Sequence, residues 1–231
     1  MTSKEDLTDF IDYRFEKIRR LNNEKKVNEV WLVRDRQTEE FAVKRFIKVG
    51  DIPCAELKEM SNPILPKIFY CAQDKSETGK IETVIIEEYI AGETLNKILS
   101  DGKFFDEDAV QDFLLQMCEG LKILHAAGII HRDIKLSNII RQYDGRIKLI
   151  DFDAVRSFKP GKSRDTVIMV TAGYSPPEQY GYGQTDPRSD ISALGETAKK
   201  LLGKNYHGRL KKFSINVLSL IRKIATNLLT N

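Results

Sequence analysis

The 231-residue sequence predicts an α+β fold in two parts, the first rich in β-strands and the second mainly helical. Runs of β-branched and aromatic residues, separated by polar turns, fill most of residues 21–90. Apolar residues then recur every three or four positions, which is typical of a helix packed in a core. Ala91-Gly92 has the composition of a hinge, so we expect one domain over residues 1–90 and another over residues 91–231.

Composition and charge exclude several classes of protein. Lys and Arg total 37 against 34 for Asp and Glu, and both signs are mixed along the chain, so nucleic acid is not the expected partner. The N-terminal residues 1–20 are charged throughout, and no segment has about 18 uncharged apolar residues in a row. We therefore expect a cytoplasmic chain with no membrane segment.

The three cysteines, Cys54, Cys71 and Cys118, lie far apart in the sequence. No histidine stands near them at the spacing of a metal site, and their number is odd. This pattern predicts reduced, buried thiols.

The first part begins with residues 4–20, whose apolar side chains are spaced roughly as in an amphipathic helix. A polar break then separates two β-rich runs, Val30–Val33 and Phe41–Ile47, which predicts a hairpin. Pro53 and Pro63 confine the next element to a short helix. Further strands are expected at Ile68–Ala72 and Thr83–Tyr89.

The second part contains the clearest helix of the sequence, opened by acidic residues 106–108 and ended by Gly128. Its core-facing residues are Val110, Phe113, Leu114, Met117, Cys118, Leu121 and Leu124. Short strands at residues 129–130, 139–140 and 147–150 follow, and they bracket polar loops. Loops held between strands are a usual position for reactive side chains. The chain is helical in pattern again from Ser189.

The polar loop at residues 131–138 has the side chains that phosphoryl transfer from ATP requires. Asp133 can accept a hydrogen bond from a hydroxyl nucleophile, and Lys135 can reach the transferring phosphate. Asn138 offers an oxygen to Mg²⁺, and Asp151, directly after the next strand, is a charged metal ligand. A single aspartate in a loop usually caps a turn. The order Asp133, Lys135, Asn138 and Asp151 together favours a catalytic site.

The sequence His131-Arg132-Asp133-Ile134-Lys135-Leu136-Ser137-Asn138, followed by Asp151-Phe152-Asp153, resembles the catalytic and metal-binding loops of the protein kinase family. The resemblance implies a two-lobed kinase fold, with a small β-rich N-lobe containing one short helix and a larger, mainly helical C-lobe. It also implies that residues 190–195 begin the helix that anchors the catalytic loop.

Further motifs give roles by the same resemblance. Lys44, in Ala42-Val43-Lys44, would contact the ATP phosphates and pair with Glu56, and backbone groups of Glu88 and Ile90 would meet the adenine. Lys135 resembles the lysine of serine/threonine kinases, and the segment 177–186 resembles bacterial members of the family. The expected activity is transfer of the γ-phosphate of ATP to protein hydroxyls, with Mg²⁺, or Mn²⁺ as an alternative metal.

The resemblance extends to the segment between Asp151 and Glu178, which corresponds to the activation segment and ends in Thr171-Ala172-Gly173-Tyr174-Ser175-Pro176-Pro177-Glu178. Arg132 would receive a phosphate from this segment, since a guanidinium binds such an anion through paired donors. Ser163 and Thr166 are candidates for that phosphorylation, and Thr171 is a candidate either for it or for a hydrogen bond to the catalytic loop.

The sequence also departs from the family pattern. Asn23, Lys25 and Asn28 stand where the phosphate-covering loop has glycines, Asp153 replaces a glycine, and Glu87 is polar at the back of the adenine pocket. The helix that contains Glu56 is about one turn short, and the last C-lobe helices are expected to be missing.

Two alternative functions stay open. These departures suit a pseudokinase, a nucleotide-binding signalling scaffold with little phosphotransfer. A small-molecule phosphotransferase is the other, although Lys135 and the 171–178 segment favour a protein substrate.

Overall fold

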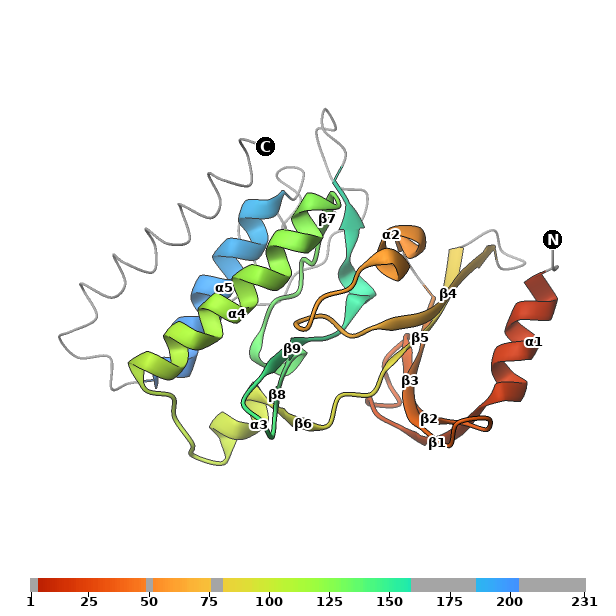
Figure 1. The fold of residues 1–231 in the computed structure, drawn as a ribbon, viewed down its shortest axis with the longest axis horizontal. Helices are drawn as coiled ribbons and strands as arrows, with labels where there is room; N and C mark the ends of the chain where they lie inside the picture. The colour runs from red at the N-terminus through yellow and green to blue at the C-terminus, as the bar shows by residue number, and fades with distance from the viewer. Residues whose placement is uncertain (1–3, 49–51, 76–80, 159–185, 204–231) are drawn as a thin grey trace. The chain divides into compact units, whose positions relative to one another are not determined.

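The computed structural model describes residues 4–48, 52–75, 81–158 and 186–203. The chain is a mixed α+β protein that divides into two compact units (Figure 1). Unit 1 comprises residues 1–61 and 66–90, and unit 2 comprises residues 62–65 and 91–231. The short segment 62–65 thus belongs to the second unit, although it precedes the predicted hinge.

A five-stranded antiparallel sheet with the order β1-β2-β3-β5-β4 forms the centre of unit 1. The predicted hairpin is confirmed as β2 and β3, and the two later strands are confirmed as β4 and β5. The strand bounds are β1 Phe15–Arg20, β2 Glu29–Asp35, β3 Phe41–Ile47, β4 Ile68–Lys75 and β5 Ile81–Glu88.

The lead-in element is a helix over only part of its expected length. Helix α1 covers Lys4–Arg14, and the chain then enters β1, which pairs with β2. Ile11 at the end of the helix and Phe15 at the start of the strand are both buried in one apolar cluster, which also contains Ile86 of β5. Strand pairing and this cluster prevail over the helical spacing that continues to Ile18.

Arg14 fixes the end of α1 against the sheet. Its Nε and Nη2 atoms donate to Oδ2 of Asp35 at 2.9 and 2.6 Å, and its Nη1 atom donates to the hydroxyl of Tyr70 at 2.9 Å. The hydrogen bond from Arg14 holds the pKa of Asp35 below its usual value, although burial acts in the opposite direction. Helix α1 is therefore attached to the sheet through both apolar and ionic contacts.

Helix α2, Cys54–Glu59, confirms the predicted short helix, and a disulfide ties its first residue to Cys71 of β4. The prediction of reduced thiols is therefore wrong for Cys54 and Cys71. Their separation of 17 residues gave no sign of pairing, and it is the packing of α2 beside β4 that brings their Cα atoms to 5.4 Å. Cys118 is a buried free thiol as predicted, and burial raises its pKa to about 11.

We expect the double substitution Cys54→Ala/Cys71→Ala to lower the free energy of unfolding by about 2–3 kcal/mol, because it removes a crosslink that restricts the unfolded chain. Urea denaturation with and without a reductant measures this effect. Reductant should lower the midpoint of the unsubstituted protein and leave the double variant unchanged. If reductant does not change the urea midpoint of the unsubstituted protein, the disulfide is contradicted.

In unit 2, the predicted core helix is α4, Glu107–Ala126, and it packs beside α5, Pro187–Leu202 (Figure 1). Asp106 caps α4 by accepting a hydrogen bond from the Ala109 amide at 2.8 Å. Gly128 follows the helix with φ +69°, a conformation that glycine adopts without strain. The other helical elements in the described part of unit 2 are α3 Leu95–Ser100 and the 3₁₀ turns η1 Leu136–Asn138 and η2 Phe152–Ala154.

Two small antiparallel sheets complete the described part of unit 2. One has the order β6-β8-β9 and the other pairs β7 with β10. The strand bounds are β6 Gly92–Thr94, β7 Ile129–Ile130, β8 Ile139–Gln142, β9 Ile147–Leu149 and β10 Arg156–Ser157.

Segment 62–65 joins this unit through close contacts. The Ile64 carbonyl accepts a hydrogen bond from the Leu149 amide at 2.8 Å, and the Leu65 carbonyl accepts one from Lys148 Nζ at 3.0 Å. A Cβ atom at Gly120 of α4 would lie 2.8 Å from Cγ2 of Ile64, so glycine permits this approach.

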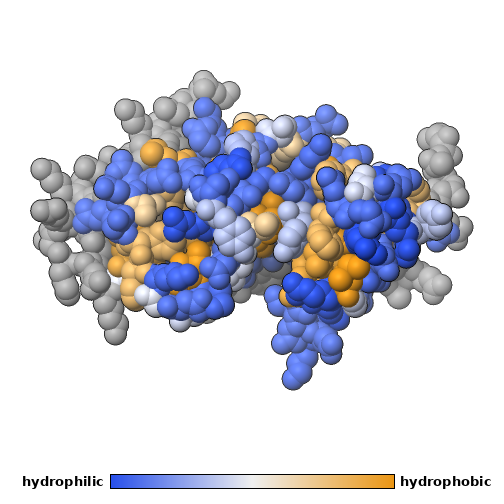
Figure 2. All heavy atoms as spheres, turned by 60° about the horizontal axis from the view of Figure 1, so that its bottom comes forward, coloured by the Kyte–Doolittle hydropathy of each residue, from blue (hydrophilic) through white to orange (hydrophobic). Residues whose placement is uncertain are grey.

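Hydrophilic side chains cover most of the face drawn in Figure 2, and hydrophobic side chains appear between them in separate places. Within the described ranges, no helix has the length and apolar character needed to cross a membrane.

Candidate active site

Three of the predicted site residues meet in the loop between β7 and β8. Lys135 Nζ donates to Oδ2 of Asp133 at 2.7 Å, and Asn138 Nδ2 donates to the same oxygen at 2.8 Å. The same side-chain nitrogen, Nδ2 of Asn138, also donates to the Asp133 carbonyl at 2.9 Å. The side chains of Asp133 and Lys135 keep 19% and 22% of their surface exposed, so a substrate can approach the pair.

Asp151, the fourth predicted residue, is held next to Asn138 by the backbone. The amide of Ile150 donates to the Asn138 carbonyl at 2.8 Å. Asp151 has φ +77°, in the left-handed region, and its carboxylate accepts a hydrogen bond from the Asp153 amide at 3.3 Å. A non-glycine residue in this region is uncommon and is often found at functional sites.

The donor atoms of Asn138 and Asp151 fit a magnesium ion. Asn138 uses Nδ2 on Asp133, and its Oδ1 accepts a hydrogen bond only from Ser137 Oγ, at 3.4 Å, among the bonds described. This oxygen is the amide atom that can act as a ligand, and Asp151 supplies a carboxylate. Among the described residues, no group of three or more His, Cys, Asp or Glu side chains could hold a metal. An ion here would therefore complete its shell with water and substrate phosphate oxygens, as magnesium commonly does.

Asp190 of α5 anchors the start of the loop between β7 and β8. Its carboxylate is fully buried and accepts hydrogen bonds from the backbone amides of His131 and Arg132 at 2.9 and 2.8 Å. The ring of His125 lies 2.8 Å from the same carboxylate. Burial alone would raise the pKa of Asp190, but the hydrogen bond and charge of His125 bring it below its usual value. The predicted anchoring by helix 190–195 is thus confirmed.

His131 is also fully buried, and its ring centroid lies 5.8 Å from that of Phe152. Burial lowers the pKa of His131, and the nearby carboxylates of Asp190, Asp133 and Asp151 offset this only in part. The ring is therefore a neutral packing group between the catalytic loop and η2.

This burial predicts a pH dependence of stability. His131 has a lower pKa in the folded than in the unfolded state, so the unfolded chain binds more protons as the pH falls below about 6.5. We expect His131→Phe to reduce the loss of unfolding free energy between pH 7 and pH 5 by up to about 2 kcal/mol. Urea denaturation at both pH values, on variant and unsubstituted protein, measures this. Equal losses in the two proteins would contradict it.

Unit 1 does not bring Lys44 and Glu56 together. Lys44 Nζ forms its ion pair with Asp12 of α1, and Glu56 is exposed on α2. The neighbouring Arg45 is buried and donates from Nε to Oε1 of Glu87 at 2.6 Å. The structure therefore contains two cation–carboxylate pairs at β3 in place of the expected one.

At the predicted hinge, the amide of Glu88 donates to the Lys67 carbonyl at 2.9 Å. Any contact of the Glu88 backbone with adenine would therefore have to use its carbonyl oxygen. Ile90, the other predicted adenine contact, is 5% exposed and ends unit 1.

Asparagine side chains close the β1–β2 turn that lacks glycines. Asn22 accepts from the Val30 amide at 3.2 Å and donates to the Asn28 carbonyl at 2.7 Å, and Asn23 accepts from the Lys25 amide at 2.9 Å. None of these residues has a positive φ. The turn thus forms without the left-handed backbone that glycine would supply. The backbone amides of Lys25 and Val30 donate to asparagine side chains of the turn itself.

The candidate phosphorylation sites Ser163, Thr166 and Thr171, together with Glu178, lie outside the described residues. Arg132, their expected partner, is buried with φ +69°. Its role toward a phosphate stays a prediction.

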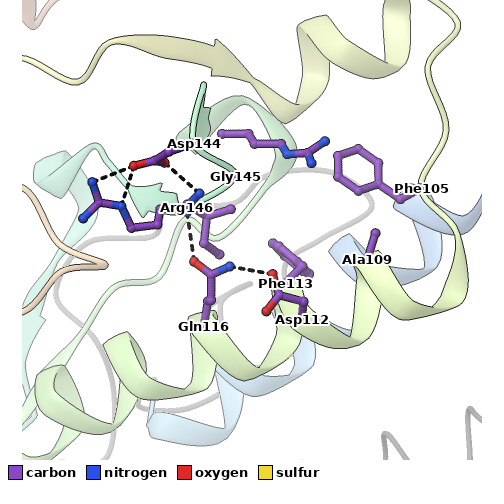
Figure 3. Close-up of a pocket in the computed structure, with 10 residues that line it drawn as sticks. Phe105, Ala109, Asp112, Phe113, Gln116, Asp144, Gly145 and Arg146 are labelled. Atoms are coloured by element: carbon purple, nitrogen blue, oxygen red, sulfur yellow. Dashed lines mark hydrogen bonds and ion pairs between the residues drawn. The ribbon is translucent and has the colours of Figure 1, made fainter.

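A pocket of about 290 Å³ lies on unit 2 between α4 and the β8–β9 turn (Figure 3). Phe113 and Ile147 line it, and Gln116 joins its walls by accepting from the Ile147 amide at 3.0 Å and donating to Asp112 at 2.7 Å. The predicted site residues do not line this pocket, so it is no part of the candidate active site.

Comparison with known families decides the identity of the domain. The family model of the protein kinase domain matches residues 26–227, which is most of the chain. The chain belongs to the protein kinase family. The match includes strands β2 to β5 of unit 1 and the loop that contains Asp133 and Asn138.

Three curated relatives to which this kinase domain is similar come from bacteria. Serine/threonine-protein kinase PknL of Mycobacterium tuberculosis is 37% identical over 130 residues, covering 56% of this chain and 32% of the relative. Serine/threonine-protein kinase F of Synechocystis is 33% identical over 145 residues, covering 61% and 29%. Serine/threonine-protein kinase PknA of Nostoc is 38% identical over 125 residues, covering 51% and 22%. The matched regions thus span about a third or less of these relatives.

The structure shows partners at β3 that the sequence did not single out, Asp12 for Lys44 and Arg45 for Glu87. The sequence pattern indicated no function for the segment that contains Asp12, and Arg45 belongs to none of the motifs that resemble the family. The alternation of side chains along β3 was the one available signal, because it places Lys44 and Arg45 on opposite faces.

Proposed function

We propose that this kinase domain transfers the γ-phosphate of magnesium-ATP to serine or threonine hydroxyls of proteins, with unit 1 as N-lobe and unit 2 as C-lobe. The observation that carries the proposal is the meeting of Asp133, Lys135 and Asn138 within hydrogen-bond distance, beside Asp151. The names of the bacterial relatives support the serine/threonine assignment.

In this reaction Asp133 accepts the proton of the substrate hydroxyl as its oxygen bonds to the γ-phosphorus. The bond from that phosphorus to the β–γ bridging oxygen breaks, and ADP leaves with the bond electrons. Lys135, 2.7 Å from Asp133, neutralises charge on the transferring group. Magnesium, which Asn138 and Asp151 would hold, supplies further charge neutralisation at the phosphates.

The remaining assignments belong to the same proposal. Glu88 and Ile90 would contact adenine, and Arg132 would bind a phosphate on the segment that contains Ser163, Thr166 and Thr171. A protein substrate and a cytoplasmic location are predictions from the sequence.

Incubation with γ-labelled ATP, Mg²⁺ and a generic protein such as casein tests the proposal. We expect label on serine or threonine of casein or of the chain itself, and none on aminoglycosides or choline. Label on a small molecule and not on protein would favour a small-molecule phosphotransferase and overturn the protein-kinase assignment.

One alternative has structural support. A pseudokinase would bind nucleotide without transfer, and both the asparagine-closed turn and the engagement of Lys44 by Asp12 favour it. Thermal stabilisation by ATP without any label transfer, even to the chain itself, would identify this function.

A further inference from the structure

One face of α4 forms a wall of the pocket drawn in Figure 3. Four residues of α4 line this pocket at spacings of three and four, so they share one side of the helix: Ala109, Asp112, Phe113 and Gln116. The facing wall is the β8–β9 turn, residues 144–147. Gln116 joins the two walls by accepting a hydrogen bond from the Ile147 amide at 3.0 Å. Contacts within unit 2 therefore form this first pocket without a ligand.

A second pocket of about 200 Å³ adjoins the first, and the two share Arg141 and Gly145. Ile98 and Tyr143 line the second pocket, and Tyr143 is 86% exposed. The first pocket, of about 290 Å³, is at the small end of the range for ligand sites. Two small adjoining pockets suit successive side chains of an extended peptide.

Arg141 of β8 lies at the boundary of the two pockets. In the ladders it stands opposite Ile147 of β9 and Glu93 of β6, and directly paired residues share a face of the sheet. Its guanidinium carbon lies 5.4 Å from the centre of the Phe105 ring, which also lines the first pocket. The ring thus holds the guanidinium in place at the pocket.

The guanidinium of Arg141 keeps its hydrogen-bond donors for a ligand. Within the described ranges, the ring of Phe105 is the partner of this cation, and no hydrogen bond or ion pair occupies its nitrogens. A ring contact uses the face of a guanidinium, whereas its five N–H donors lie in the plane. These donors form a fork that matches a carboxylate.

The carboxylates that line the two pockets have other partners. Asp144 pairs with Arg146 at 2.6 Å, Glu93 lies 4.0 Å from Lys103, and Asp112 accepts a hydrogen bond from Gln116 at 2.7 Å. Although Glu93 stands opposite Arg141 in the ladder, its ion pair is thus with Lys103. The charge of Arg141 therefore calls for an anion from outside the described residues.

We infer that these two pockets bind an acidic segment of the protein that the kinase domain phosphorylates. A carboxylate of that segment binds Arg141, and neighbouring apolar side chains enter the pockets on either side. The inference rests on the proposed function for the identity of the partner, a protein substrate. It concerns binding at residues other than Asp133 and Asn138, so binding and phosphate transfer can fail separately.

The first test measures peptide binding to the full chain by fluorescence anisotropy. One labelled peptide alternates glutamate and leucine, and a second has glutamine in place of glutamate. Neither contains serine or threonine, so binding does not depend on phosphate transfer. Arg141→Gln removes the charge, and Arg141→Lys keeps the charge without the planar fork. Arg146→Gln tests the other arginine of the first pocket, and Arg19→Gln is a matched control at an exposed arginine of β1.

We expect the unsubstituted protein to bind the glutamate peptide about 10-fold more tightly than the glutamine peptide. Arg141→Gln should remove this preference, Arg141→Lys should retain part of it, and Arg146→Gln and Arg19→Gln should keep it. Equal affinity for the two peptides in the unsubstituted protein, or a preference that survives Arg141→Gln, overturns the inference. So does displacement of the peptide by an equal concentration of inorganic phosphate, which would indicate a general anion site. Dimerisation that Arg141→Gln abolishes would assign the pockets to a second copy and overturn it as well.

The second test asks whether the pockets serve the substrate. Casein fused to the glutamate–leucine segment should have a KM about threefold or more below that of casein fused to the glutamine–leucine segment, with equal kcat. Arg141→Gln should make the two KM values equal and leave the KM for ATP unchanged. Equal KM values in the unsubstituted protein overturn the assignment to substrate. If neither fusion is phosphorylated and the peptide preference persists, the proposed function fails and the acidic-peptide site stands.

Discussion

The variant Asp133→Asn is expected to transfer phosphate about 10²- to 10⁴-fold more slowly than the unsubstituted protein. The substitution keeps the shape of the side chain and an oxygen that can accept from Lys135 and Asn138, and it removes the carboxylate that would take the hydroxyl proton. ATP affinity should stay within about threefold, because Asp133 acts on the hydroxyl and not on the nucleotide. Initial rates of label transfer and calorimetric ATP binding measure the two effects.

Asp144→Asn serves as the control for this substitution. Asp144 is a surface carboxylate of the same unit, and it pairs with Arg146 at 2.6 Å. Its substitution should leave the rate of phosphate transfer unchanged. Unchanged transfer in Asp133→Asn would exclude Asp133 as the base.

The second large effect is expected at Asp190. Asp190→Ala would leave the buried amides of His131 and Arg132 without their acceptor, and it would remove the carboxylate beside His125. We expect a loss of about 3–5 kcal/mol in the free energy of unfolding, accompanied by loss of phosphate transfer. Urea denaturation followed by circular dichroism measures the stability.

A matched variant on the same helix separates this effect from a general weakening of α5. Asp186 caps α5 by accepting from the Arg188 amide at 2.8 Å, and Asp186→Ala should cost only about 1 kcal/mol. Equal costs at Asp186 and Asp190 would mean that Asp190 does not anchor the loop.

The sequence predicted those parts of the molecule that depend on local pattern. The apolar spacing of α4 and the β-rich runs of β2 and β3 are local features of the sequence, so they could be recognised without tertiary information. The meeting of Asp133, Lys135 and Asn138 was also predictable, because these residues lie in one short loop.

Features that depend on contacts between distant elements could not be predicted. The end of α1 at Arg14 follows from the pairing of β1 with β2. The Cys54–Cys71 disulfide follows from the position of α2 beside β4. The partner of Lys44 follows from the register of β3, which the alternation of side chains leaves undetermined until the neighbouring strands are known.

The structure of the domain bound to magnesium and a non-hydrolysable ATP analogue tests the central claim most directly. The account predicts magnesium at about 2.1 Å from both Asn138 Oδ1 and an oxygen of Asp151, with the γ-phosphate beside Lys135 and Asp133. A bound nucleotide whose metal touches neither Asn138 nor Asp151, or whose γ-phosphate lies away from Asp133, would contradict it.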